Sequence, residues 1–176
     1  MEQKLAKESL TIMTELVLPN DTNTLNNLMG GRLLHWMDIA AAISAQRHCH
    51  NTVVTASVDN VSFKHPIKLG AIVSIEAQVT RAFTTSVEVR MRVWAQNVPS
   101  GERIESNTAY YTFVALDENG AKIQVPRVVP ETAEEQIQYD LALQRRELRL
   151  VLAGKMQPDE ANEIRQLFGR RQPSID

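Results

Sequence analysis

Asp38 is the residue whose surroundings in the sequence most need a chemical explanation. It is the only carboxylate between Asp21 and Asp59, and the residues beside it are mostly leucine, methionine, tryptophan, isoleucine and alanine. Burial of an ionised carboxylate costs free energy unless the group is paired or used. Three interpretations stay open. Asp38 pairs with His35, three residues earlier on the same helix face, it forms a salt bridge at an interface, or it serves as a catalytic acid or base.

An asparagine-rich loop that ends in two glycines precedes Asp38. Gly30 and Gly31 would let a backbone approach a ligand closely, and the first turn of a helix offers unpaired N–H groups to negative charge. The side chain of Asn27, four residues before Gly31, would add a donor. These groups together would make an oxyanion site beside Asp38. The alternative is an ordinary turn that caps a helix.

Other motifs give weaker indications. Lys64 and Lys68 flank Pro66 and would either bind phosphates as point charges or lie in a solvated loop. The His-Cys-His run at residues 48–50 has poor spacing for one tetrahedral metal site, so we expect a frayed helix end and no metal. The glycine-rich nucleotide-binding motifs and the G-x-S-x-G serine motif are absent.

Composition limits the class of protein. With 176 residues, 43% hydrophobic and 23% charged, the chain is expected to form one folded domain with a short appendage. The net charge of -2 argues against a long nucleic-acid-binding track. A single cysteine excludes an internal disulfide, the first ten residues lack the apolar stretch of a secretory signal, and no apolar run is long enough to cross a membrane. We therefore expect a cytoplasmic protein.

The elements that must position these residues are one long helix and several strands. Residues 32–47 are apolar on every side, which predicts a buried helix. Alternating or β-branched patterns predict strands at 11–18, 53–63, 72–79, 86–94 and 104–116, the later ones pairing as an antiparallel meander. Thr132-x-x-Glu135 is a capping-box pattern that begins a helical tail, and Pro158 is expected to open a short final helix. One long helix enclosed by a curled antiparallel sheet of about five strands is the α+β hotdog architecture.

The segment N-L-M-G-G-R-L-L-H-W-M-D at residues 27–38 resembles the signature of the acyl-CoA thioesterases with the hotdog fold. The closer similarity is to the cytosolic, brain-type acyl-CoA hydrolases and their single-domain bacterial relatives. It continues through L-P-N-D-T-N at 18–23, V-V-T-A-S-V-D at 53–59 and V-P-E-T at 129–132. The resemblance implies a thioesterase domain over residues 8–125 and a helical extension over 126–176.

The resemblance also implies a reaction and a site. An acyl-CoA thioester would be hydrolysed to a free fatty acid and CoA, with no cofactor beyond the CoA of the substrate. Asp38 would be catalytic, Asn27 would come from the neighbouring subunit, and an N–H at Gly31 would stabilise the oxyanion. The substrate would further contact Gly30, Lys64, Lys68, Arg81 and Ser86. The family implies a dimer, commonly assembled into a hexamer as a trimer of dimers.

Two alternatives from other classes stay open. A non-catalytic acyl-CoA-binding protein with the same fold would be expected to carry a pair of DNA-binding helices, against which the net charge and the short tail argue. A hotdog hydratase or dehydratase would need a catalytic histidine beside the acid. His35 lies one turn from Asp38, but the order of two glycines, helix and aspartate favours hydrolysis.

Overall fold

The computed structural model describes residues 2–59, 61–63 and 65–169, with side chains described as far as residue 166. The chain divides into two compact units, Met1–Glu131 and Thr132–Asp176, which are treated separately below. The domain limits expected from the sequence, 8–125 and 126–176, remain predictions.

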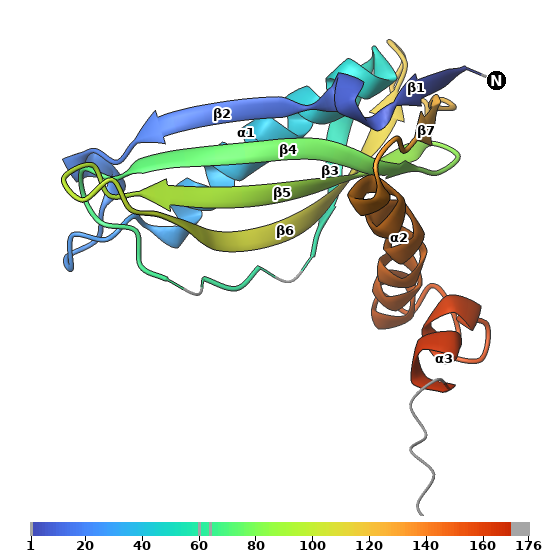
Figure 1. The fold of residues 1–176 in the computed structure, drawn as a ribbon. Helices are drawn as coiled ribbons and strands as arrows, with labels where there is room; N and C mark the ends of the chain where they lie inside the picture. Colours follow the sequence, from blue (N-terminus) through green and yellow to red (C-terminus); the bar gives the residue numbers. More distant parts are fainter. Residues whose placement is uncertain (1, 60, 64, 170–176) are drawn as a thin grey trace, which may run out of the picture. The chain divides into compact units, whose positions relative to one another are not determined.

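A five-stranded antiparallel sheet forms the frame of the first unit (Figure 1). Its order across the sheet is β2-β4-β5-β6-β3, so β2 and β3 are the two edges. The strands β4, β5 and β6 follow one another along the chain and pair antiparallel, which confirms the predicted meander. The strands are β2 (Thr11–Leu16), β3 (Thr52–Val58), β4 (Ile72–Ala82), β5 (Ser86–Gln96) and β6 (Arg103–Leu116).

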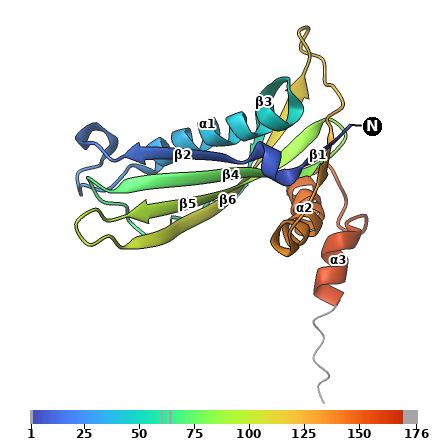
Figure 2. The ribbon, with the colours of Figure 1, turned by 45° about the horizontal axis from the view of Figure 1, so that its top comes forward.

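The long helix α1 (Gly30–Cys49) lies along one face of this sheet and contacts all five strands (Figures 1 and 2). Met37, Ala40 and Ala41 of the helix are fully buried, as are the inward valines, isoleucine and methionine of β4 and β5. The alanines let the helix approach the sheet closely, and each large apolar side chain buried there contributes about 1.5–3 kcal/mol. This arrangement confirms the predicted hotdog fold.

The apolar composition of α1 predicts a helix enclosed on every side, but one side of it is open. Ile39 and Ile43 stay 38% and 37% exposed, because the sheet covers only one side of α1. The strand that follows is also shorter than predicted, since β3 ends at Val58 instead of continuing to Phe63. The first unit therefore leaves an apolar stripe of its helix uncovered.

The C-terminal end of α1 is anchored, and the expectation of a frayed end is wrong. His48 is fully buried, and its Nε2 donates a hydrogen bond to the carbonyl oxygen of Pro126 over 2.8 Å. Lys4 Nζ donates to the carbonyl oxygen of His48, also over 2.8 Å. These contacts involve a two-stranded parallel sheet that the sequence patterns did not indicate, formed by β1 (Gln3–Leu5) and β7 (Arg127–Val129), with the 3₁₀ helix η1 (Ala6–Ser9) between β1 and β2.

The second unit contains two helices. The capping box that begins α2 (Ala133–Leu152) is confirmed, because Thr132 Oγ1 accepts from the N–H of Glu135 and the Glu135 carboxylate accepts from the N–H of Thr132, each over 3.1 Å. The final helix, α3 (Asn162–Gly169), begins later than the predicted start at Pro158. The Glu147 carboxylate accepts the N–H groups of the first turn of α3. None of the helices in the described ranges is long and apolar enough to span a membrane.

Candidate active site

Asp38 lies on α1, half-buried, and is held by a hydroxyl group. Thr55 Oγ1, on the edge strand β3, donates a hydrogen bond to Asp38 Oδ1 over 2.9 Å. Its predicted partner His35 is exposed and forms no hydrogen bond with it in the described part of the chain. Tyr111 on β6 is buried, and burial together with the negative charge of Asp38 raises the pKa of this phenol to about 12. The carboxylate is thus hydrogen-bonded to a threonine and close enough to a protonated phenol to affect its pKa, and no imidazole of the described residues is paired with it.

A buried carboxylate that the sequence analysis did not single out fixes the loop before α1. Asp21, in the 3₁₀ helix η2 (Pro19–Asp21), is 3% exposed. Its Oδ1 accepts from Arg32 Nε over 2.6 Å and its Oδ2 from the N–H of Leu18 over 3.0 Å. The hydrogen bond from Arg32 is the main reason that the pKa of Asp21 lies below its ordinary value. Because Arg32 belongs to the first turn of α1, this ion pair holds the loop against the start of the helix.

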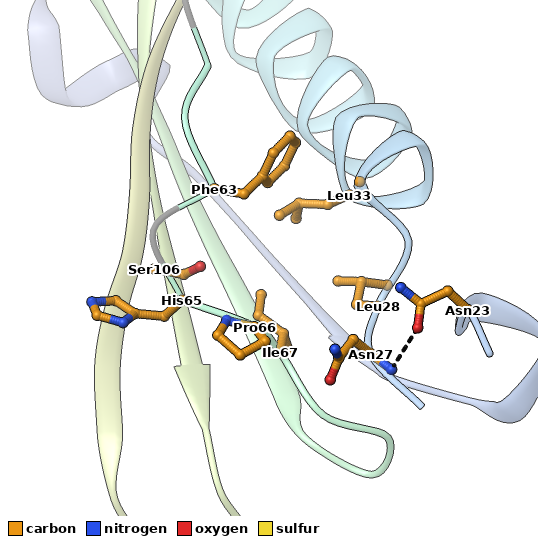
Figure 3. A pocket seen from close by; sticks show the side chains of 10 residues that line it. Asn23, Asn27, Leu28, Leu33, Phe63, His65, Pro66, Ile67 and Ser106 are labelled. Atoms are coloured by element: carbon orange, nitrogen blue, oxygen red, sulfur yellow. Dashed lines mark hydrogen bonds between the residues drawn. The ribbon is translucent and has the colours of Figure 1, made fainter. Parts of the chain in front are cut away.

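The two asparagines of this loop play different parts. Asn23 Oδ1 accepts the N–H groups of Leu25 and Asn27, over 2.9 and 3.2 Å, in a local turn that asparagine favours (Figure 3). The side-chain Oδ1 of Asn27 is buried and has no hydrogen-bond partner among the described residues. Because Asn23 Oδ1 accepts these two N–H groups, the orientation of the Asn23 side-chain amide is fixed. Its Nδ2 is then available to donate a hydrogen bond.

The two glycines at the start of α1 meet different surroundings. A Cβ placed on Gly30 would lie 3.2 and 3.3 Å from ring atoms of Phe63, whereas one placed on Gly31 would meet no atom within 4 Å. The N–H of Gly31 belongs to the first helical turn, which has no carbonyl partner within the helix. In the described part of the chain it donates no hydrogen bond to a carbonyl outside the helix either. Gly31 thus has open space where a side chain would stand, and its N–H has no backbone partner in the described part of the chain.

A cavity of about 360 Å³ opens beside this loop (Figure 3). One wall comes from the loop and the start of α1, and the other from the segment before β4 together with β6. Its lining residues are Asn23, Asn27, Leu28, Gly30, Leu33, Phe63, His65, Pro66, Ile67 and Ser106. Lys68 is exposed, and its backbone forms a β-bridge with Asn27. One predicted CoA-binding lysine therefore lies next to the cavity.

The other predicted site residues are not gathered there. Asp38 lies eight residues after Gly30 on α1, about 12 Å along the helix axis, and does not line the cavity. Arg81 and Ser86 lie at the opposite end of the sheet from Lys68, since β4 runs about 30 Å from Ile72 to Arg81. Lys64 lies outside the described residues.

Two further chemistries find no support at this site. Cys49 is 4% exposed, and burial raises the pKa of its thiol to about 11, so the thiol stays protonated near neutral pH. Across residues 2–59, 61–63 and 65–166, no three histidine, cysteine or carboxylate side chains gather in a way that would hold a metal ion.

Comparison with known proteins identifies the family. The profile of the Thioesterase superfamily matches residues 25–101. An uncharacterized acyl-CoA thioester hydrolase of Bacillus subtilis (strain 168) is 46% identical over 144 residues, covering 82% of this chain and 84% of that protein. Mouse acyl-coenzyme A thioesterase 11 is 41% identical over 141 residues, so this chain matches 24% of that longer protein. The chain therefore belongs to the thioesterase superfamily, among the acyl-CoA thioester hydrolases.

Solved structures agree with this assignment. An apo hexameric acyl-CoA thioesterase superimposes with a TM-score of 0.85 and 40% identity, covering 87% of this chain and 98% of that one. An acyl-CoA hydrolase from Staphylococcus aureus, solved with butyryl-CoA and CoA, gives a TM-score of 0.82 and 36% identity over 96% of this chain and 98% of that one. Three single variants of the same enzyme have also been solved, each with one residue replaced by alanine. The replaced residues are an aspartate, an asparagine fifteen positions before that aspartate, and a threonine seventeen positions after it.

Proposed function

We propose that this acyl-CoA thioester hydrolase cleaves its substrate to a free fatty acid and CoA with Asp38 as the general base. The observation that carries this proposal is the Asp38 carboxylate itself, half-buried on an apolar helix and oriented by the Thr55 hydroxyl. That hydrogen bond occupies Oδ1 and leaves Oδ2 to accept a proton from water. This orientation supports a role for the carboxylate as general base toward a water molecule beside it.

The reaction then proceeds through a tetrahedral intermediate. As Asp38 takes a proton from water, the water oxygen bonds to the thioester carbon and the carbonyl oxygen becomes negatively charged. The unpaired N–H of Gly31 stabilises that oxygen. The carbon–sulfur bond breaks, CoA departs as a thiolate, and the proton held by Asp38 passes to the thiolate. The alternative, direct attack by Asp38, forms an anhydride. When water opens this anhydride at the Asp38 carbonyl, a single turnover in ¹⁸O-labelled water leaves the label in Asp38, which general-base catalysis never does.

The asparagine of the site is better assigned to Asn23 than to Asn27. Asn23, Asp38 and Thr55 lie at the same intervals as the asparagine, aspartate and threonine that were replaced in the Staphylococcus aureus enzyme. Asn23 also has the available donor, because its Oδ1 already accepts two N–H groups. The catalytic role of Asn27 remains a prediction, and the two asparagines can be separated experimentally.

We propose that each site is shared between two protomers. Within one chain, the cavity beside Asn23 and the Asp38 carboxylate lie apart along α1. Apolar side chains are exposed along the edge strand β3 and on the open side of α1, where Val54 and Val58 are 44% and 51% exposed. A two-fold contact over this surface would cover the stripe and bring the loop of one protomer to Asp38 of its partner. We further propose that three such dimers assemble into a hexamer and that the protein works in the cytoplasm.

The CoA phosphates are proposed to lie near Lys68, an exposed cation beside the cavity. Roles for Lys64, Arg81 and Ser86 in CoA binding remain predictions. Gly30 would contribute by its lack of a side chain, which lets the ring of Phe63 lie close to the start of α1 and narrows the cavity there.

The test of the proposed function is thiol release from a panel of acyl-CoAs of increasing chain length. A thiol-reactive dye suits this assay because the only cysteine is buried and its thiol is protonated. We expect CoA to be released with one fatty acid per thiol. Binding without turnover would instead indicate an acyl-CoA-binding protein, and addition of water to an enoyl-CoA would indicate a hydratase.

A further inference from the structure

Asp21 joins the two ends of the loop that precedes α1. Its carboxylate accepts hydrogen bonds from the N–H of Leu18 and from Arg32 Nε, and its main-chain carbonyl oxygen accepts the N–H of Met29 over 2.9 Å. Leu18 lies before the loop, Met29 is the N-cap residue of α1, and Arg32 belongs to the first turn of the helix. One aspartate therefore fastens the chain that enters the loop to the chain that leaves it.

The segment after Asp21 is a short hairpin that carries Asn23. Thr22 and Leu28 form an antiparallel β-bridge, and the N–H of Asn23 donates to the carbonyl oxygen of Asn27 over 2.8 Å. The Asn23 side chain is held as well, since its Oδ1 is turned toward the N–H of Asn27 and its Nδ2 to the other side (Figure 3). The position of Asn23 Nδ2 therefore depends on where the whole hairpin is placed.

The hairpin and the start of α1 have to keep a fixed separation for the proposed reaction. The Gly31 N–H is carried by the helix and Asn23 Nδ2 by the hairpin, so the two donors of the site come from two elements. Donors stabilise a developing oxyanion only when they lie within hydrogen-bond distance of it. A displacement of about 1 Å between acting groups can lower a rate roughly 100-fold. A firm contact between the hairpin and the first turn of α1 is therefore needed.

The Asp21–Arg32 ion pair provides this contact. The N-cap residue Met29 makes no side-chain capping hydrogen bond. Among the described residues, no other hydrogen bond or ion pair between side chains joins residues 18–29 to the first turn of α1. Hydrogen bonds between charged groups are shorter and stronger than neutral ones, and this one spans 2.6 Å. Because the carboxylate is 3% exposed, loss of Arg32 would leave a buried charge that has to move toward water.

We propose that Asp21 is a positioning residue for the hydrolysis and that it acts on Asn23 through Arg32. The ion pair sets the hairpin against the first turn of α1 so that Asn23 Nδ2 and the Gly31 N–H reach the same thioester oxygen. Neither charged group touches the substrate. This inference rests on the proposed function, because it states how two donors of that site are held at the right separation.

The test is Arg32→Gln beside a matched control. The Arg32 side chain is 37% exposed, so its replacement should leave a folded protein that lacks the ion pair. The control Arg92→Gln removes an ion pair of similar exposure, on the sheet face away from α1, since Arg92 alternates with buried residues of β5. We expect kcat to fall about 10-fold in Arg32→Gln, less than the ~100-fold cost of losing an oxyanion donor. KM should stay within about 2-fold, and Arg92→Gln should change neither constant.

Repetition in an Asn23→Ala background separates positioning from a general loss of structure. Without the Asn23 amide the ion pair has no donor to place, so Arg32→Gln should change kcat less than about 2-fold in that background. A merely structural role would lower kcat by the same factor in both backgrounds. Equal losses, or a wild-type kcat in Arg32→Gln with a lowered melting temperature, would overturn the proposal.

Asp21→Asn provides a second variant, should Arg32→Gln fold poorly. It removes the charge at the other end of the ion pair, so it should lower kcat by a similar factor. The double variant should lose no more activity than the less active single variant, because the two residues act as one unit. Losses that multiply in the double variant would show that the residues act separately, against the proposal.

The same measurements separate this proposal from the proposed function. Normal hydrolysis of acyl-CoA by the wild type, with Arg32→Gln unaffected, would contradict the positioning role alone. A fully active Asn23→Ala would overturn the assignment of that asparagine and this proposal with it. Absence of hydrolysis by the wild type would contradict the proposed function itself.

Discussion

Thr55 Oγ1 donates a hydrogen bond to Asp38 Oδ1, and this contact joins the edge strand β3 to the apolar helix α1. Thr55 is exposed and its neighbours on β3 pair with β6, so the hydroxyl has no evident part in the core. Its position beside the only carboxylate of the helix indicates that it orients Asp38.

Removal of this hydroxyl should therefore affect turnover more than folding. We expect Thr55→Val, which keeps the β-branched shape, to lower kcat about 10-fold, equivalent to about 1.4 kcal/mol of activation free energy. Thr55→Ser should retain most of the activity, because it keeps the donor. The readout is kcat and KM for each variant, with the melting temperature as a control. Wild-type kcat in Thr55→Val would show that the hydrogen bond does not position the base.

Gly31→Ala should separate stability from activity. The methyl group would meet no atom of the protein within 4 Å. Alanine inside a helix is more stable than glycine by about 0.5–1 kcal/mol, so the melting temperature should stay the same or rise. Because the proposed function places the thioester oxygen at the Gly31 N–H, a substrate that fills the open space beside Gly31 would meet this methyl group, and kcat/KM should fall by at least ~10-fold. A variant that is both stable and fully active would place the oxyanion elsewhere.

Mixing of site variants tests the shared site and identifies its asparagine. Asp38→Asn is refolded together with Asn23→Ala in one experiment and with Asn27→Ala in another. About half of the dimers formed by random assortment are mixed, and each mixed dimer regains one intact site of its two. Roughly a quarter of wild-type activity should therefore return in the experiment in which the substituted asparagine is the catalytic one.

We expect this recovery with Asn23→Ala, while Asn27→Ala should already be active alone at saturating substrate. Native mass spectrometry confirms that hybrids form. Confirmed hybrids with no more activity than the separate parents would show that both residues act within one chain.

His48 should make stability depend on pH. Burial lowers the pKa of this histidine below its ordinary value of 6.5, so near that pH the unfolded chain takes up a proton that the native protein does not. The contribution of His48 to the free energy of unfolding should therefore be at its maximum above pH 6.5. Below that pH the free energy of unfolding should fall, by up to about 1.4 kcal/mol per pH unit. Melting curves between pH 7.5 and 5 should show a weaker slope in His48→Gln. The exposed control His35→Gln should keep the wild-type slope, and equal slopes in all three would exclude His48 as the cause.

The main elements of the fold could be predicted because each has a local cause. Alternation of valines sets the strands β4 and β5, the absence of glycine and proline after Gly31 permits α1, and the Thr132 capping box begins α2. The small parallel sheet of β1 and β7 had no such signal. Its strands have three residues each and their paired residues are 124 positions apart in the chain, so only tertiary packing reveals the pair.

The candidate site was predictable in part. Asp38 and the two glycines were visible as residue types that conflict with their surroundings. Thr55 and Asp21 were not, because a threonine in a strand and an aspartate after Pro-Asn are ordinary in sequence. Their roles depend on the pairing of β3 beside α1 and on the approach of Arg32 to the loop. The burial of Ser106 likewise depends on a one-residue shift in strand register, which a pattern of period two does not show.

The most direct measurement of the central claim is thiol release from acyl-CoA by Asp38→Asn beside the wild type. The substitution keeps the size of the side chain and an oxygen that can accept from Thr55, but it removes the base. We predict that kcat falls at least ~100-fold while the oligomeric state and melting temperature stay close to those of the wild type. Hydrolysis within a few-fold of the wild type, in a correctly assembled Asp38→Asn protein, would contradict the account.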